Sequence, residues 1–197
     1  DMITQFDASK FRTKFACEIK NFEPTDFLDR KEARKIDRFT QLALVVSDQA
    51  MADAGLNKEN INPDRVGVVF ASGIGGLITF QHEVTDFARG DGTPRFNPFF
   101  IPKMILDIAA GQISMRHNLR GPNFAVVSAC ASSTNAIMDA FNLIRLGKSD
   151  IIVTGGSEAV ISEAGVGGFN AMKAMSERND DPKTASRPYD KDRDGFV

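Results

Sequence analysis

Helical and strand-like patterns of apolar residues alternate along most of the chain from residue 37 onward. Short, continuously apolar runs rich in β-branched residues indicate buried strands, and three of them occur, at 66–71, 124–128 and 151–154. Apolar residues at three- and four-residue steps indicate helices, over 37–55, 76–90, 102–113 and 131–146. Strands that alternate with helices predict βαβ units, and therefore an α/β fold with a parallel sheet covered on both faces.

Local features refine the expected bounds of these elements. Pro102 suits the first position of its helix, since a proline there loses no helical hydrogen bond. The pair Gly155-Gly156 is expected to interrupt the third strand. The helix over 131–146 is expected to have one apolar face, formed by Ile137, Ala140, Phe141 and Ile144.

The charge and hydropathy of the chain exclude several function classes. The 197 residues include 24 basic and 26 acidic side chains, a formal net charge of −2, without the basic excess of a sequence-independent nucleic-acid binder. No apolar run approaches the ~20 residues that a transmembrane helix needs, and the N-terminal residues do not follow the order of a signal peptide. We therefore expect neither a nucleic-acid partner nor a membrane partner.

Cysteine and histidine are too scarce for a disulfide framework or for most metal sites. The two cysteines, Cys17 and Cys130, lie far apart in dissimilar surroundings, and the only histidines are His82 and His117. No Cys/His cluster has the spacing of a zinc site. The simplest interpretation is a protein of the reducing cytoplasm without a metal.

The most informative chemistry lies in the segment Val127–Thr134, which reads Val-Ser-Ala-Cys-Ala-Ser-Ser-Thr. An apolar strand leads into Cys130 and a helix follows at once, so the sulfur is expected at a helix N-terminus. Unpaired N–H groups and the helix dipole stabilise a thiolate there. The N–H groups of the turn, including that of Cys130, could hold a developing oxyanion, and small neighbours leave room for a carbonyl carbon. The pattern predicts a nucleophile.

A purely structural interpretation of Cys130 stays open on the local pattern alone. A buried cysteine between a strand and a helix is often only a small apolar side chain. Cys17 has none of the surroundings of Cys130, and we interpret it as inert.

The nucleophile segment resembles that of the β-ketoacyl-[acyl-carrier-protein] synthases, and further motifs match the same family in the same order. These motifs are Ser72–Gly76, Asn97–Pro102, Leu119–Pro122, Gly155–Glu158 and Arg187–Phe196. The resemblance covers nearly the whole chain and is closest to the synthase II branch, which elongates acyl chains in type II fatty acid synthesis.

The resemblance implies a thiolase-like fold, layered α/β/α around a mixed, mostly parallel sheet. It also implies a reaction in three stages: acyl transfer from an acyl carrier protein to Cys130, decarboxylation of malonyl-carrier protein, and condensation to a chain two carbons longer. Covalent holding of the acyl group divides one difficult reaction into two easier steps. Neither an organic cofactor nor a nucleotide is implied, because Ile78 replaces the third glycine of a dinucleotide motif.

The family also uses two histidines and a lysine, all in the second half of its fold. We therefore expect residues 1–197 to be the N-terminal half of such a synthase, with the opening strand and the C-terminal half absent. His82 and His117 do not match the catalytic histidines, and we interpret both as surface or structural residues. On this hypothesis the 197 residues alone cannot condense acyl groups.

Three apolar side chains resemble the residues that line the acyl pocket in this family. Ile74 lies in the glycine-rich turn, Phe169 follows Gly167-Gly168, and Phe100 resembles a residue that reaches the neighbouring subunit's pocket. A homodimer is therefore implied. Without the motifs, core packing would be the better interpretation of all three.

A set of basic residues falls where the family docks its acidic carrier protein, and these are Lys31, Arg34, Lys35, Arg95 and Lys173. The segment 30–35 is expected to be a docking segment, since a local basic patch can steer an anionic partner even on a slightly acidic protein. The alternative is an ordinary solvated helix face.

Two other functions remain open at this stage. A polyketide ketosynthase or a synthase I would share this nucleophile region. A non-catalytic dimerisation or scaffold protein is an alternative of another class, although Cys130 argues against a chain-length-determining subunit, which lacks the nucleophile. Glu158 is interpreted as a buried structural carboxylate rather than a general base.

Overall fold

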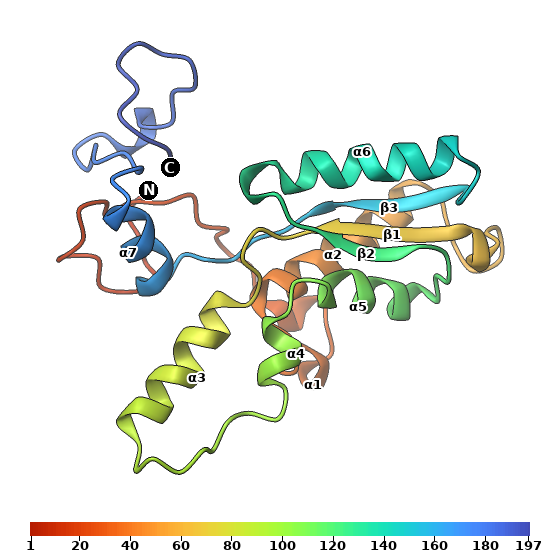
Figure 1. Ribbon diagram of the computed structural model, residues 1–197, viewed down its shortest axis with the longest axis horizontal. Helices are drawn as coiled ribbons and strands as arrows, with labels where there is room; N and C mark the ends of the chain where they lie inside the picture. Colours follow the sequence, from red (N-terminus) through yellow and green to blue (C-terminus); the bar gives the residue numbers. More distant parts are fainter. The chain divides into compact units, whose positions relative to one another are not determined.

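The chain divides into two compact units, and each is described by itself. A computed structural model describes all residues, 1–197. The larger unit comprises Glu23–Ala159, and the smaller joins Asp1–Phe22 to Val160–Val197. All three strands belong to the larger unit, which we call the sheet unit; the smaller is the terminal unit (Figure 1).

A parallel sheet of three strands forms the centre of the sheet unit, in the order β2-β1-β3. The strands are β1 (Val66–Ala71), β2 (Asn123–Val126) and β3 (Ile151–Gly156). Every residue of β1 is buried, which explains its unbroken apolar run. In the register of the sheet, Ala71 pairs with Val126 on one side and with Gly156 on the other. The C-terminal ends of all three strands therefore meet at one edge.

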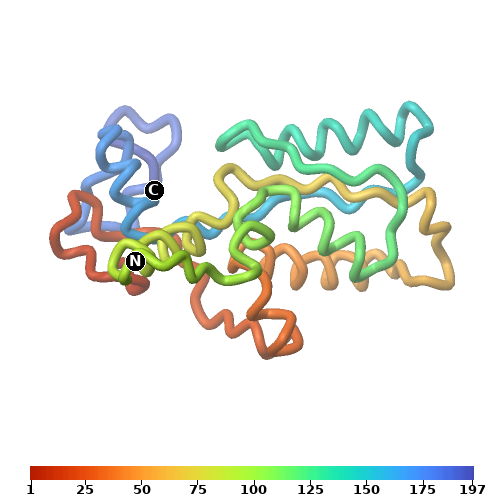
Figure 2. Tube along the Cα trace, turned by 60° about the horizontal axis from the view of Figure 1, so that its bottom comes forward, coloured from red at the N-terminus to blue at the C-terminus, as the bar shows by residue number.

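Helices cover both faces of this sheet, as Figures 1 and 2 show. One face is covered by α6 (Ser132–Arg145), and the other by α5 (Ile108–His117), on which α2 (Arg38–Asp53) packs. The remaining helical elements of this unit are η1 (Pro24–Asp26), α1 (Arg30–Ala33), η2 (Pro63–Arg65), α3 (Leu77–Arg89), α4 (Phe100–Met104) and η3 (Ala129–Ala131). The predicted α/β architecture is confirmed, with three layers in this unit.

The helix predicted from Pro102 onward is divided into two in the structure. Pro102 is the third residue of α4, not the first, and α4 ends at Met104. Its place in the first turn still costs no hydrogen bond. The division arises because the Met104 carbonyl accepts a hydrogen bond from the Gly76 N–H at 3.1 Å, and Ile105 turns to an extended conformation.

The apolar face predicted for the helix over 131–146 is wrong for its large residues. The sheet side of α6 is formed by Ser132, Ala136 and Ala140, all buried, whereas Ile137 and Phe141 are more than half exposed. Ala136 packs in a core cluster with Val69 and Ala71 of β1. Small side chains on that face let the helix approach the sheet closely, and Leu143 also packs against this cluster, whereas Ile137 and Phe141 face away from it.

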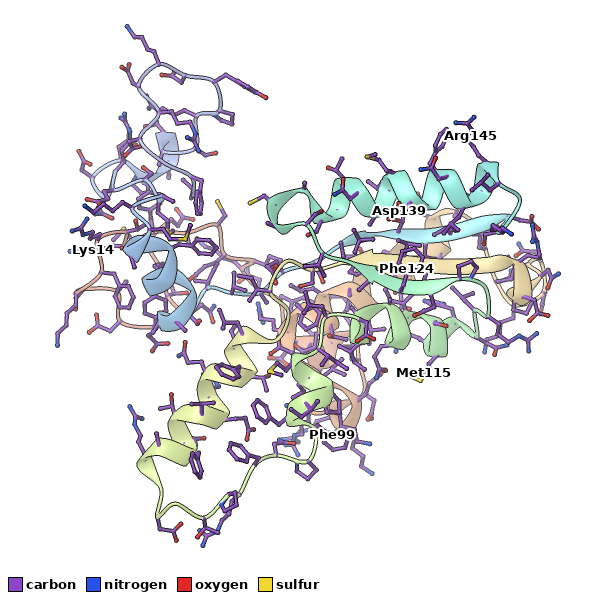
Figure 3. All side chains as sticks on the ribbon, viewed as in Figure 1. Lys14, Phe99, Met115, Phe124, Asp139 and Arg145 are labelled. Atoms are coloured by element: carbon purple, nitrogen blue, oxygen red, sulfur yellow. The ribbon has the colours of Figure 1, made fainter.

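The outward direction of this second face is visible at the C-terminal end of α6. Arg145 points away from the sheet in Figure 3 and lies over the Phe141 ring at 5.5 Å from its centroid. On the opposite side of the sheet unit, Met115 of α5 also points outward and is exposed.

The prediction that Gly155-Gly156 interrupts the third strand is also wrong, because β3 includes both residues and pairs them with β1.

The terminal unit is held together by hydrogen bonds between its two chain segments. Thr13 donates from its Oγ1 to the Ser176 carbonyl at 2.8 Å and from its N–H to Asn170 Oδ1 at 2.9 Å. Each segment also has an isolated bridge of its own, which pairs Met2 with Phe15 in the first and Met175 with Phe196 in the second. The helical elements here are α7 (Glu163–Ala171) and η4 (Pro182–Thr184).

Candidate active site around Cys130

The candidate site lies at the edge where the three parallel strands end. A glycine-rich turn, Ser72–Gly76, follows β1, and the turn that contains Cys130 follows β2. Ser157 and Glu158 follow β3. Carboxyl ends of parallel strands are where open α/β sheets place their ligands, because the chain leaves each strand there to form loops.

Cys130 is an exposed free cysteine in the short helical turn η3, directly before α6. The hydrogen bonds of this turn are donated by the Ala131 N–H to the Ser128 carbonyl at 3.1 Å, and by the Ser132 N–H to Ala129. The turn itself therefore does not use the N–H of Cys130. The structure agrees with the prediction of a thiol at a strand-to-helix corner, since the sulfur is neither buried nor remote from a helix start.

The backbone immediately before the cysteine is strained. Ala129 has a φ of +52°, in the left-handed region that side chains other than glycine seldom adopt. Such strain persists only where the surrounding structure enforces it, and it is common at catalytic turns. The strained residue directly precedes the exposed Cys130.

Side chains that sequence reasoning did not assign brace this turn. The Ser128 N–H donates to Ser132 Oγ at 2.8 Å, and Ser132 Oγ donates to the Ala129 carbonyl at 2.6 Å. Asn135 Nδ2 donates to Ser128 Oγ at 2.7 Å. The signal available in the sequence was the run of serines around Cys130, since short polar side chains bond nearby backbone groups at helix starts.

The glycine-rich turn brings Ile74 beside the Cys130 turn. A methyl group built on Gly73 would lie 3.6 Å from the Ala129 carbonyl oxygen, so the two turns are in close contact. Gly75 has a φ of +75°, which favours glycine. Ile74 is 39% exposed, so it is available to line an acyl pocket rather than being sealed in the core.

Glu158 is a structural carboxylate, as predicted, but it is not buried. The residue is exposed, and its carboxylate accepts hydrogen bonds from the glycine-rich turn. The prediction failed on burial because a carboxylate can be satisfied by backbone N–H groups at the end of a sheet as well as in its interior.

Phe100 begins α4 and belongs to a row of aromatic rings on α3, α4 and the segment between them. Its ring stacks on Phe96 at 5.4 Å and on Phe80 at 6.3 Å, and Phe96 in turn stacks on Phe87 at 5.3 Å. Phe80, Phe87 and Phe96 are each about two-fifths exposed. The last residue of α4, Met104, accepts a hydrogen bond from Gly76 at the end of the glycine-rich turn. The helix that begins with Phe100 is therefore attached to the turn that contains Ile74.

The basic docking candidates of the sheet unit are exposed. Lys31 lies in α1, and Arg34 and Lys35 follow it. Arg116 draws the acidic Glu32 of this segment into an ion pair at 3.2 Å. Because Glu32 is paired with Arg116 from α5, it does not neutralise the basic side chains of its own segment. Lys35 lies over the ring of Phe99, labelled in Figure 3, at 5.5 Å, whereas Arg95 is paired with Asp91 at 3.3 Å.

Two of the predicted site residues belong to the terminal unit. Phe169 in α7 meets the Phe196 ring edge-on at 5.3 Å. Lys173 is exposed, has a φ of +55°, and lines a pocket of about 270 Å³ together with Lys10 and Arg12. Within that unit, the structure therefore places Lys173 in a basic surface.

The histidines and the second cysteine lie outside the Cys130 turn. His82 is exposed on α3, and His117 ends α5 with its Nε2 3.0 Å from an Asp48 carboxylate oxygen. Burial lowers the pKa of His117, although Asp48 opposes the shift. Cys17 is exposed in an irregular segment of the terminal unit.

The structure contains neither a candidate metal cluster nor a candidate membrane-spanning helix. No group of three or more histidine, cysteine, aspartate or glutamate side chains is placed to hold a metal ion. None of the helices combines the length and the apolar character needed to cross a bilayer.

Comparisons with known proteins relate the whole chain to one family. The model of the beta-ketoacyl synthase N-terminal domain matches residues 4–197. The 3-oxoacyl-[acyl-carrier-protein] synthase 2 of Synechocystis is 46% identical over 195 residues, which are 99% of this chain and 47% of that protein. The protein of the same name from Staphylococcus aureus is 45% identical over 197 residues, 100% of this chain and 47% of its own length.

A solved structure agrees with these relatives. The crystal structure of a beta-ketoacyl synthase from Burkholderia phymatum is 30% identical, with a TM-score of 0.81, and the match covers 97% of this chain and 47% of that one. The chain thus spans about half the length of the curated relatives that it matches. With a family model that matches nearly every residue and a cysteine at the strand-to-helix corner, the chain belongs to the β-ketoacyl synthase family.

Proposed function

We propose that the complete protein is a 3-oxoacyl-[acyl-carrier-protein] synthase of fatty acid synthesis that elongates an acyl chain by two carbons. The observation that carries the proposal is the exposed Cys130 on a strained turn at the start of α6, in contact with the turn that holds Ile74. The names of the curated relatives support the same activity. The two exposed free cysteines suit a reducing cytoplasm.

The reaction begins with transfer of the acyl group to the sulfur. The Cys130 thiolate attacks the carbonyl carbon of the acyl thioester on the carrier protein, a new C–S bond forms, and the carrier thiol leaves with a proton. The N–H of Cys130, which the turn does not use, is available to the oxyanion of the tetrahedral intermediate. Malonyl-carrier protein then loses CO2, and its carbanion attacks the acyl carbon, so that the C–C bond forms as the Cys130 thiolate leaves.

Mass spectrometry of the acylated protein tests this proposal. The complete protein is incubated with acyl-carrier protein, digested, and mapped for a peptide that carries the mass of the acyl group. We expect a hydroxylamine-labile acyl group on the peptide that contains Cys130 and none on the peptide that contains Cys17. An acyl group on neither cysteine would overturn the proposal and would favour a scaffold function.

A second measurement concerns condensation by residues 1–197 alone. The family resemblance assigns decarboxylation to two histidines and a lysine, and neither His82 nor His117 matches them. We expect the isolated 197 residues to form no β-ketoacyl product from acyl- and malonyl-carrier protein. Turnover at the rate of the complete protein would contradict this part of the proposal.

The basic segment 30–35 supports docking of an acidic carrier protein. Lys31 and Arg34 are exposed, and the ion pair of Glu32 with Arg116 leaves their charge uncompensated within the segment. The double variant Lys31→Glu/Arg34→Glu should slow acyl transfer from carrier protein at low salt, and the difference should shrink as salt screens the charges. As control, Lys58→Glu lies outside this segment. Equal rates for both variants would remove the docking assignment, including the weaker candidates Arg95 and Lys173.

The aromatic row on α3, α4 and the segment between them supports a homodimer. Phe80, Phe87 and Phe96 expose part of their rings side by side, and an exposed apolar patch of this kind commonly marks a protein interface. In this arrangement Phe100 contributes to the acyl pocket of the second copy, and Ile74 to that of its own copy. Light scattering of the complete protein and of a Phe87→Glu variant tests the assignment, since the variant should shift toward a monomer.

A further inference from the structure

A single carboxylate collects the hydrogen bonds of the glycine-rich turn. The N–H groups of Gly73 and Ile74 donate to Glu158 Oε2 at 2.7 and 3.0 Å, and the N–H of Gly75 donates to Oε1 at 3.2 Å. Ser72 Oγ donates to the same Oε1 at 3.0 Å. Successive N–H groups that converge on one anion form a concave nest, which holds the anion in a fixed place.

The backbone that carries Glu158 is itself fixed. The preceding Ser157 donates from its N–H to the Ala71 carbonyl at 3.0 Å and from its Oγ to the Phe39 carbonyl at 2.7 Å. The first bond ties Ser157 to the end of β1, and the second ties it to α2. Glu158 therefore extends from a rigid point of the sheet edge, although the residue is exposed.

The opposite side of the glycine-rich turn rests on α4. The Gly76 N–H donates to the Met104 carbonyl at 3.1 Å, and a methyl group on Gly76 would overlap the Lys103 carbonyl. The turn is thus held between α4 and the Glu158 carboxylate. Gly73, the residue before Ile74, borders the Cys130 turn, because a methyl group built on it would lie 3.6 Å from the Ala129 carbonyl oxygen. Ile74 itself is partly exposed.

We infer that Glu158 is a positioning residue. It holds Ile74 in a fixed place relative to the Cys130 turn and thereby determines which acyl chains reach the sulfur. Four donors on one carboxylate fix the turn more firmly than the one backbone bond to α4. Glu158 acts through Ile74 and does not touch the reacting atoms. The inference rests on the proposed acyl transfer to Cys130.

The variant Glu158→Gln tests the inference with little change of shape. An amide has one acceptor oxygen and carries no charge. With that oxygen facing Gly73 and Ile74, its NH2 group can donate to Ser72 Oγ, but the hydrogen bond from the Gly75 N–H is lost, and the remaining bonds are no longer charge-assisted. The turn should loosen while β3 and Ser157 keep their own bonds. The matched control is Glu18→Gln, because the Glu18 carboxylate also accepts from two successive N–H groups, of Thr4 and Gln5, and from one hydroxyl, in the terminal unit.

Two rates at Cys130 are compared in the complete protein. One is acylation by the longest acyl-carrier protein that the wild type accepts, and the other is alkylation by iodoacetamide, which is too small to sense the acyl pocket. We expect Glu158→Gln to slow acylation about fivefold or more while alkylation stays within about twofold of the wild type. Glu18→Gln should change neither rate.

Hydrogen exchange of the peptide that contains residues 72–76 provides a readout independent of catalysis. We expect faster exchange of this peptide in Glu158→Gln, with unchanged exchange in β1. Unchanged exchange, an unchanged acylation rate, or equal slowing of acylation and alkylation would each overturn the inference. A wild-type protein that is never acylated at Cys130 would instead refute the proposed function, so the two failures are distinguishable.

Discussion

The two cysteines of this chain are equally free and both exposed, yet their surroundings differ completely. Cys130 lies between a strand and a helix, after a residue with a left-handed backbone, and serine side chains bond the turn on both sides. Cys17 lies in an irregular segment, where the neighbouring Ala16 N–H donates to the Asp1 carbonyl at 2.9 Å.

The difference shows that exposure by itself says little about a thiol. A nucleophile of the proposed kind needs backbone donors near its reactive atom, and of the two cysteines only Cys130 lies at a helix start with an N–H that its turn does not use. Cys17 is therefore an internal control for every measurement on Cys130. Two measurements should separate the two residues and a third should isolate the strain at the Cys130 turn, in order of decreasing effect.

Removal of the sulfur should give the largest difference. Cys130→Ala should lower acyl transfer by roughly a thousandfold or more, because no other group can form the thioester. Cys17→Ala should leave the rate within about twofold. Steady-state transfer from a radiolabelled acyl-carrier protein measures both, and comparable losses in the two variants would contradict the assignment of the nucleophile.

Alkylation should separate the two thiols by roughly fivefold. A helix N-terminus attracts negative charge by about 0.3–1 kcal/mol at exposed sites, and Cys17 has no helix beside it as Cys130 has α6. Limited treatment with iodoacetamide followed by peptide mapping should therefore label Cys130 first. In denaturant the two rates should become equal, since the helix is lost. Preferential labelling of Cys17 in the folded protein would show that the corner has no electrostatic effect.

Backbone strain at the Cys130 turn should give the smallest difference. Ala129→Val places a β-branched side chain at a φ of +52° and should lower the free energy of unfolding by about 1–2 kcal/mol. Ala131→Val, in the same turn at a φ of −90°, should cost less than about 0.5 kcal/mol. Denaturant unfolding with an unchanged m-value measures both. Equal losses would mean that the strain is not specific to Ala129.

The central strand could be predicted because it is buried, whereas β2 and β3, for which the apolar runs also predict burial, are partly exposed because fewer elements cover them. The apolar run of β1 begins and ends at the predicted residues, Val66 and Ala71, since no polar residue interrupts a strand covered on both faces. The strand-to-helix corner at Cys130 followed from the same pattern. The motifs then indicated the family, which the whole-chain comparisons confirmed.

The errors share one cause, which is that contacts distant in sequence decided the outcome. The end of α4 depends on the Gly76 N–H, which captures the Met104 carbonyl, and no residue between Met104 and Ile108 signals it. Both sides of α6 are apolar, so periodicity could not tell that the small residues face the sheet. The nest around Glu158 is formed by backbone groups, which leave no pattern of side chains to recognise.

The glycine at position 156, the last residue of β3, affects where α6 begins. A Cβ on Gly156 would overlap Ser133 Oγ in the first turn of α6 and would lie 2.9 Å from the Ala71 carbonyl. The last residue of β3 therefore sets how closely the first turn of α6 can approach the strand ends. A larger residue at position 156 should push the start of α6 outward, a way to reshape the surroundings of Cys130 from the sheet without altering any side chain proposed to meet the substrate.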